Sequence, residues 1–234
     1  MTDHQEQLLD PRHPGMMEKV FHLMQVQPRD RILDLGCGSG CATRQLARLA
    51  SEGLAVGLDT SDEMVRLARR LSVEIENVLF VIGSAGGIPW QEDFFSVLLS
   101  VDSAFCWPDP EAAAREIFRV IAPGGRIFVL NTFYRENPLA ARWQQVFEAP
   151  VHLKSAAEWS DVFAAAGFEA VQASRITDET PVEADFEPTP FYCSPEERAE
   201  FRQAGALLIQ GLKPARPAVP PRNASADSTL VVVK

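Results

Sequence analysis

The chain lacks the cysteine patterns that mark disulfide-rich or zinc-binding proteins. Its 234 residues include only four cysteines, Cys37, Cys41, Cys106 and Cys193, and none of them has the Cys-x-x-Cys spacing of a zinc or redox site. A disulfide framework is not indicated either. We therefore expect no metal site and no disulfide scaffold.

Long apolar runs are also missing. The N-terminus is polar and acidic, without the apolar core of a secretory signal. No stretch approaches the roughly 20 apolar residues that a membrane span requires. These absences predict a soluble, cytoplasmic protein.

Positive charge is scarce. The 22 Lys and Arg residues are outnumbered by 32 Asp and Glu residues, which gives a net charge of −10 and a pI near 4.9. Binding to nucleic acid or to an anionic membrane needs concentrated basic surface, so we expect neither partner. A small neutral or cationic substrate fits this charge better.

The most informative segment is a strand followed by a glycine-rich loop. Residues 31–35 read as a short apolar strand, and Gly36, Gly38 and Gly40 then form a loop without side-chain bulk. Helical sequence follows over residues 41–50. Loop amides and the N-terminal end of a helix favour electron-rich ligand groups, so this unit predicts a binding site for a nucleoside cofactor.

The spacing of the glycines and an acid downstream narrow the choice of cofactor. Asp59 ends the next predicted strand, where a carboxylate can accept hydrogen bonds from the hydroxyls of a ribose. A dinucleotide fingerprint, Gly-x-Gly-x-x-Gly, would place its third glycine at Cys41 or Thr43. The sequence therefore argues against NAD(P).

Gly-x-Gly-x-Gly after an acidic strand end instead resembles motif I of the class I S-adenosylmethionine-dependent methyltransferases. Further blocks follow in the family's order at residues 59–64, 81–90 and 105–126. The last block carries Trp-Pro-Asp-Pro at residues 107–110 and Pro-Gly-Gly-Arg at 123–126, and it resembles the small-molecule branch often called type 11. Two positions depart from the pattern, because Ser84 and Ser96 stand where the family usually has aspartates.

The resemblance implies an α/β fold, a doubly wound, Rossmann-like sheet of seven mostly parallel strands with helices on both faces and an antiparallel last strand. It implies S-adenosyl-L-methionine as cofactor and a small molecule as methyl acceptor. Backbone atoms near the glycines would hold the methionine portion, and Met64 and Ala85 the adenine. The residues implied to bind the cofactor are Asp34, Gly36, Cys37, Gly38, Gly40, Asp59, Thr60, Met64, Ser84, Ala85 and Ser100.

The catalytic residue stays open. Methyl transfer needs a general base only if the accepting atom arrives protonated. The candidates are His13, Asp102, Tyr134 and His152, and for each of them a surface or packing role is the alternative. Two other functions remain: an enzyme of this fold with other chemistry or a protein substrate, and a non-catalytic protein that binds the cofactor.

The chain reads as one domain, residues 1–234. An N-terminal helical cap occupies residues 1–28 and a cofactor-binding core residues 29–131. Insertions at 132–154 and 181–228 are predicted to form a lid over the substrate. The first contains an aromatic-rich helix candidate. The second begins a helix at Ser194 that continues to Leu212, whose alternative role is packing or dimerisation. The seventh strand is predicted at residues 229–234, and the protein is expected to be a monomer or a homodimer.

Overall fold

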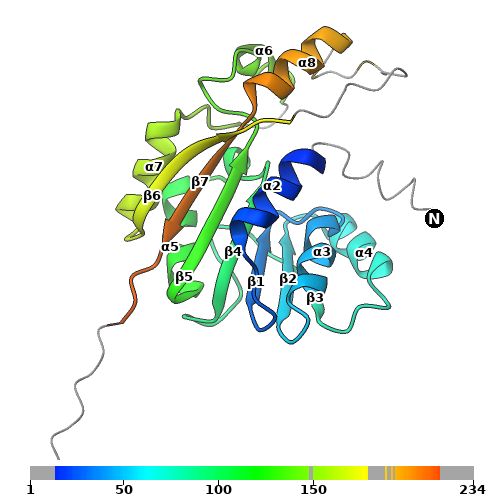
Figure 1. The fold of residues 1–234 in the computed structure, drawn as a ribbon, viewed down its shortest axis with the longest axis vertical. Helices are drawn as coiled ribbons and strands as arrows, with labels where there is room; N and C mark the ends of the chain where they lie inside the picture. The colour runs from blue at the N-terminus through cyan, green and yellow to red at the C-terminus, as the bar shows by residue number, and fades with distance from the viewer. Residues whose placement is uncertain (1–13, 148–149, 179–187, 189–190, 192, 217–234) are drawn as a thin grey trace, which may run out of the picture.

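The protein is described by a computed structural model that covers residues 14–147, 150–178, 188, 191 and 193–216 (Figure 1). Within these residues one seven-stranded sheet has the order β3-β2-β1-β4-β5-β7-β6. β7 runs antiparallel to β5 and β6, and the other pairs are parallel. The strands are β1 (Arg31–Leu35), β2 (Leu54–Asp59), β3 (Val78–Ile82), β4 (Phe95–Val101), β5 (Ile121–Asn131), β6 (Glu169–Ile176) and β7 (Ala206–Leu212).

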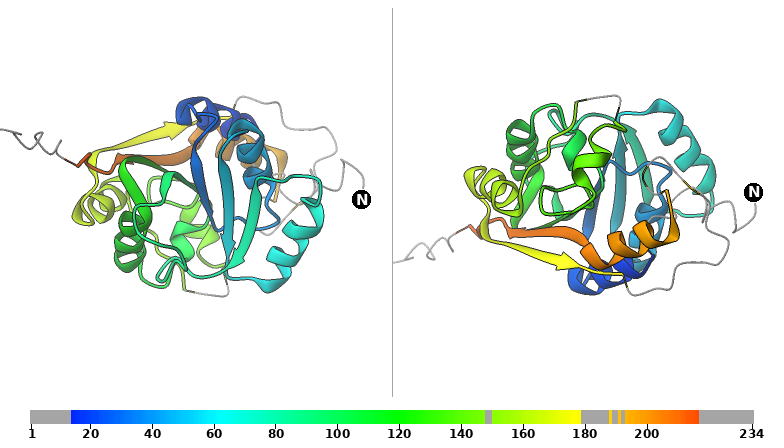
Figure 2. Two further views of the ribbon diagram at one scale, coloured as in Figure 1. Left: turned by 90° about the horizontal axis from the view of Figure 1, so that it is seen from below. Right: turned by 90° about the horizontal axis from the view of Figure 1, so that it is seen from above.

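Helices cover both faces of this sheet, as the views along the strands show (Figure 2). α5 and α7 pack together on one face, while α3 and α4 lie against β1, β2 and β3 on the other. The helices are α2 (Pro14–Met24), α3 (Cys41–Leu49), α4 (Asp62–Leu71), α5 (Pro110–Val120), α6 (Ala140–Trp143), α7 (Ala156–Ala165) and α8 (Pro195–Ala204), with a 3-10 turn η1 (Ala104–Cys106). The predicted doubly wound α/β class is confirmed.

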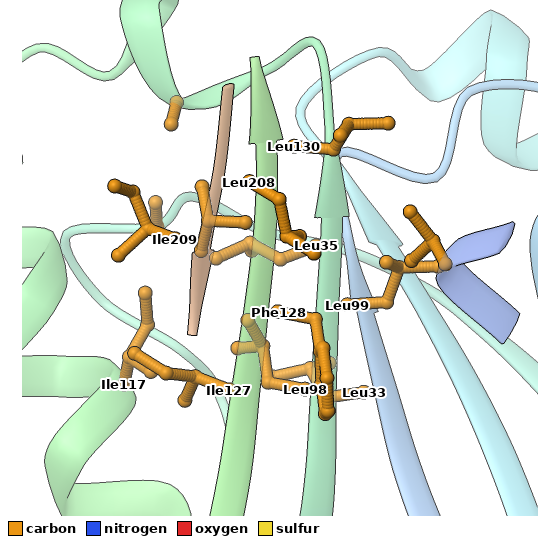
Figure 3. Packing of buried hydrophobic residues seen from close by; sticks show 14 of the residues in the cluster. Leu33, Leu35, Leu98, Leu99, Ile117, Ile127, Phe128, Leu130, Leu208 and Ile209 are labelled. Carbon is orange, nitrogen blue, oxygen red and sulfur yellow. The ribbon is translucent and has the colours of Figure 1, made fainter. Parts of the chain in front are cut away.

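The central strands are apolar on both faces because helices bury both faces. Leu33 and Leu35 of β1 are at most 1% exposed, and Leu98 and Leu99 of β4 are fully buried. Figure 3 shows these side chains packed with Ile127 of β5 and neighbours on α5 and β7. This core fixes the carboxyl ends of β1, β2, β4 and β5 along one edge of the sheet.

Local hydrogen bonds explain where several helices begin. The Ser155 hydroxyl accepts from the Glu158 amide, and the Glu158 carboxylate accepts from the Ser155 amide at 2.6 Å, which forms a capping box at the start of α7. Thr60 and Glu63 also have the spacing of a capping box in the sequence, but the structure does not form one. Ser61 caps α4 instead, accepting from the Met64 amide, because Asp59 Oδ1 already binds the Ser61 amide and orients the chain there.

The end of the chain differs from the prediction. The helix that begins after Ser194 ends at Ala204 and does not continue to Leu212. Gly205 adopts φ +72°, which breaks the helix. The following apolar run, Ala206–Leu212, is β7 and enters the sheet between β5 and β6. The predicted insertion 181–228 therefore contains the seventh strand, and residues 229–234 lie outside the described part of the chain.

The predicted aromatic-rich helix in 132–154 is also shorter than expected. Among the described residues of this range, 132–147 and 150–154, only α6, Ala140–Trp143, is helical. The preceding segment is held instead by Asn137, whose side chain donates to the Thr132 carbonyl at 2.8 Å and accepts from the Leu139 amide at 2.9 Å. Such side-chain bonds to the backbone compete with helix formation.

Candidate active site

The three loop glycines differ in what surrounds them. Gly36, Gly38 and Gly40 all have positive φ, at +81°, +52° and +80°, a conformation that glycine adopts at little cost. A Cβ atom on Gly36 would lie 2.4 Å from Cβ of Ser103, and one on Gly40 would lie 2.5 Å from the Phe80 ring. A Cβ on Gly38 would meet no atom within 4 Å. Gly36 and Gly40 are therefore needed for packing, whereas Gly38 faces open space.

Asp59 at the end of β2 holds this loop in place. Its Oδ2 accepts from the Gly38 amide at 2.8 Å and its Oδ1 from the Ser61 amide at 2.9 Å. The carboxylate thus sits beside the open space at Gly38, and each oxygen has a second lone pair that can accept from a hydroxyl. Sequence reasoning placed Asp59 at the ribose but missed its bond to the loop.

Two other predicted cofactor residues lie beneath the loop. Asp34 is 2% exposed, and its Oδ2 accepts from the Thr43 hydroxyl at 2.5 Å. Burial, together with the charges of Asp34 and Asp59, raises the pKa of the Cys37 thiol well above its usual range. Asp34 therefore supports the loop from inside the protein, and Cys37 stays a neutral thiol.

Ser100 and Ser103 connect the loop to β4. Ser103 Oγ donates to the Leu35 carbonyl at 2.9 Å, and the two hydroxyls lie 2.7 Å apart. Because the Ser103 proton is used at Leu35, Ser100 donates to Ser103. Ser100 is fully buried, so it positions Ser103. Ser103 was not predicted, and only the contact that it makes with Gly36 identifies it.

The residues predicted to hold adenine lie next to Asp59. The Gly83 amide donates to the Asp59 carbonyl at 2.9 Å, which brings the following Ser84 and Ala85 beside the loop. Ala85 is buried and Met64 is partly buried, whereas Thr60 is exposed. Ser84 and Gly87 form an isolated antiparallel bridge, so the residue that replaces the usual aspartate shapes a turn here.

Two of the four candidate bases are engaged in structural hydrogen bonds. Asp102 Oδ1 accepts from both the Thr132 amide and the Thr132 hydroxyl, each at 2.7 Å. The Tyr134 hydroxyl donates to the carbonyls of Ala204 and Gly205 at 3.2 and 3.3 Å, and burial raises the pKa of Tyr134. Tyr134 therefore ties the segment after β5 to the start of β7.

The two histidines are less informative. The His152 amide donates to the Phe105 carbonyl at 2.8 Å, which places this residue next to η1, beyond the end of β4. Its ring is partly exposed. His13 lies outside the described residues. Asp102, Tyr134 and His152 thus all lie near the carboxyl ends of β4 and β5.

An aromatic cluster lies beyond the carboxyl ends of β4 and β5, where sequence reasoning expected only a lid. Phe105, Phe133 and Phe147 have ring centroids 5.1 to 5.4 Å from one another. Phe191 joins them at 5.6 Å from Phe147. The ring centroids of Trp143 on α6 and Phe201 on α8 lie 5.2 Å apart, so the rings link the segment after β5 to α8. This aromatic cluster consists of Phe105, Phe133, Trp143, Phe147, Phe191 and Phe201.

Two kinds of feature are absent from the described residues. No group of three or more His, Cys, Asp or Glu side chains in them is arranged to hold a metal ion. No described helix is both long and apolar enough to cross a membrane.

Comparison with known proteins assigns the chain to a protein family. Residues 27–167, more than half of the chain, match a family model described as a methyltransferase domain (Methyltransf_31). The chain belongs to this methyltransferase family. The match spans the glycine loop, Asp59 and β4, so the family is that of the class I S-adenosylmethionine-dependent methyltransferases.

Individual relatives agree with the family. The demethylmenaquinone methyltransferase of Listeria monocytogenes is 29% identical over 140 residues, which cover 58% of each protein. The uncharacterized methyltransferase YcgJ of Bacillus subtilis is 29% identical over 158 residues, 64% of this chain and 60% of the relative. The match thus spans about three fifths of the length of these curated relatives.

A solved structure extends the similarity to nearly the whole chain. It is a Haloferax volcanii protein described as a methyltransferase, in complex with the Trm112 methyltransferase activator. The TM-score is 0.80 at 28% sequence identity, over 92% of this chain and 95% of that one. The seven-stranded, Rossmann-like methyltransferase fold is therefore shared.

Proposed function

We propose that this methyltransferase transfers the methyl group of S-adenosyl-L-methionine to a small, largely apolar molecule. The observation that carries the proposal is the open space at Gly38, beside the Asp59 carboxylate and at the carboxyl end of the sheet. Ligands of open α/β sheets bind at this edge. A loop amide and a carboxylate facing the same space suit a nucleoside with a ribose.

In this proposal each part of the site has one task. The loop backbone around Gly36 and Gly38 holds the methionine portion, Asp59 accepts from the ribose hydroxyls, and Met64 with Ala85 contacts the adenine. Asp34 is buried under the loop and supports it through its hydrogen bond with Thr43. Ser100 positions Ser103 through the hydrogen bond between their hydroxyls.

The chemistry is an in-line displacement. When bound, S-adenosylmethionine supplies a methyl group that its positively charged sulfur already activates. The protein then has to hold the acceptor in line and exclude water. His152 is the proposed proton acceptor if the methyl acceptor arrives protonated, since it lies beyond β4 and is partly exposed. Asp102 is the second candidate, although its Oδ1 also holds Thr132.

The aromatic cluster supports an apolar acceptor. Its rings stand over the ends of β4 and β5, next to β1, where the cofactor loop begins. Phe147 and Phe191 are partly exposed, and aromatic side chains at a ligand site favour ligands with extended apolar surface. The similar Listeria enzymes are named for demethylmenaquinone. An acceptor carrying an aromatic ring fits both observations.

One experiment separates the candidate functions. The purified chain is incubated with methyl-labelled S-adenosylmethionine and a metabolite extract. Label in an organic-soluble small molecule supports the proposal. Label in protein would favour a protein-modifying enzyme, and cofactor binding without any transfer would favour a non-catalytic role.

We also propose that the chain works with an activator protein. The similar Haloferax protein was solved in complex with such an activator. In this chain β3 borders only β2 among the described strands, and Leu79 and Ile82 of β3 are 48% and 47% exposed. An edge strand with apolar side chains is suited to protein contacts. Light scattering of the chain mixed with the purified Haloferax activator tests this proposal. A 1:1 complex supports it. A monomer or homodimer of unchanged mass in the presence of the activator contradicts it.

A further inference from the structure

Asn131, the last residue of β5, carries an amide without a hydrogen-bond partner. Its side chain is completely buried, and neither Nδ2 nor Oδ1 has a hydrogen-bond partner. Burying a polar group without a partner is unfavourable, and most buried side-chain polar atoms in proteins are paired. An asparagine with both ends unpaired therefore needs an explanation.

The residue that follows Asn131 is held in place by hydrogen bonds on every side. Thr132 follows Asn131 directly, and its amide and hydroxyl both donate to Asp102 at 2.7 Å. The Thr132 carbonyl accepts from the Asn137 side chain at 2.8 Å. Every polar group of Thr132 is thus bonded, which fixes the end of β5. A rigid backbone that presents one unpaired group is typical of a preorganised binding position.

Its place in the sheet puts Asn131 on the side where the acceptor must enter. β5 is two strands from β1, which is about 10 Å at the usual spacing between strands. Asn131 pairs with Leu207 of β7 and lies two residues before Phe133 of the aromatic cluster. Gly36 and Gly38 begin just beyond β1. A molecule held at Asn131 and under the aromatic rings would reach toward the cofactor loop.

We propose that the Asn131 amide binds the polar group of the methyl acceptor and so selects the acceptor. A neutral amide offers one acceptor and two donor hydrogens. It therefore pairs with an uncharged group that both donates and accepts, such as a hydroxyl or an amide on the ring-bearing acceptor. This inference rests on the proposed small-molecule function and adds the residue that reads the substrate.

The test replaces the amide by a side chain of similar size. Asn131→Leu removes both polar atoms, so its melting temperature should not fall, because a buried unpaired group is lost. Transfer of label from S-adenosylmethionine to the small molecules of the metabolite extract should drop at least tenfold. The affinity for S-adenosylhomocysteine should stay within twofold, since Asn131 is not placed in the cofactor site.

Controls separate the possible explanations. Trp159→Phe removes another fully buried donor that has no partner, on α7, and should leave transfer unchanged. Asn131→Ser keeps a smaller donor and acceptor and should retain more transfer than Asn131→Leu, which also covers the case that the leucine variant does not fold.

Two results would overturn the inference. If Asn131→Leu is folded and transfers label at the wild-type rate, the amide does not read the acceptor. If Asn131→Leu and Asn131→Ser both lose stability without a specific loss of transfer, a buried water bridges the amide and its role is structural. Absence of any small-molecule label with the wild-type protein would instead refute the proposed function itself.

Discussion

Replacing Gly38 by alanine tests the cofactor loop because this glycine alone among the three faces open space. A Cβ added at Gly38 meets no protein atom within 4 Å, so the variant should fold. The φ of +52° costs a side chain roughly 1 to 2 kcal/mol, which is offset by about 0.4 to 1 kcal/mol from the restricted unfolded chain. The net loss is roughly 1 kcal/mol, or about 2 to 4 °C in melting temperature for a chain of this size.

Gly124 provides a matched control. It has φ +79°, and a Cβ added there also meets no atom within 4 Å. It lies near the amino end of β5, at the opposite edge of the sheet from the glycine loop. Gly124→Ala should therefore lose a similar amount of stability for the same backbone reason, without touching the proposed site.

Isothermal titration with S-adenosylhomocysteine measures the difference between the two variants. Gly38→Ala should weaken binding at least tenfold, about 1.4 kcal/mol, since the new methyl group occupies space meant for the cofactor. Gly124→Ala should bind as the wild type does. Equal affinities for both folded variants would refute the placement of the cofactor at Gly38.

Three further predictions concern single side chains. Asp59→Asn should weaken S-adenosylhomocysteine binding by roughly 1 to 3 kcal/mol, because the single oxygen of an amide side chain cannot accept from both the Gly38 and Ser61 amides in this geometry. Asp62→Asn makes the same charge change on the surface of α4 and should leave binding unchanged. Equal effects of the two substitutions in calorimetric titration would contradict the assignment of Asp59. Tyr134→Phe should keep its turnover and lose about 1 kcal/mol of stability, since its hydroxyl is bonded to Ala204 and Gly205; a tenfold fall in kcat would make Tyr134 the base. Lys213→Ala should lower the free energy of unfolding by about 3 kcal/mol at pH 7, because Lys213 Nζ donates to Asp93 and to two carbonyls at 2.7 Å. Lys213 holds the pKa of Asp93 below its usual range, so this stabilisation should be present above about pH 4 and shrink as the pH falls further, in urea titrations across pH; a loss that does not depend on pH would contradict the pairing.

Sequence reasoning succeeded where local signals and burial agree. The strand Arg31–Leu35, the glycine loop and α3 follow one another without a competing pattern, and all three are found in the structure. Asp109 caps α5 with Pro110 in its first turn, as expected. These elements lie in the parallel part of the sheet, where a strand reads as an apolar run between turn signals.

It failed where tertiary contacts decide the structure. Phe201, Leu208 and Leu212 have helical spacing, yet Gly205 divides them between α8 and β7. A strand buried on both faces gives no alternating pattern, so the run 206–212 could not be told from a buried helix. Ser103 and Asn131 were missed because their roles depend on contacts between strands that only the folded sheet brings together.

The most direct test of the central claim is a pair of calorimetric titrations of the wild-type protein, one with S-adenosylmethionine and one with NAD. The glycine spacing and the Asp59 carboxylate predict one bound S-adenosylmethionine per chain, with much weaker or no binding of NAD. Binding of NAD more tightly than S-adenosylmethionine would contradict the account.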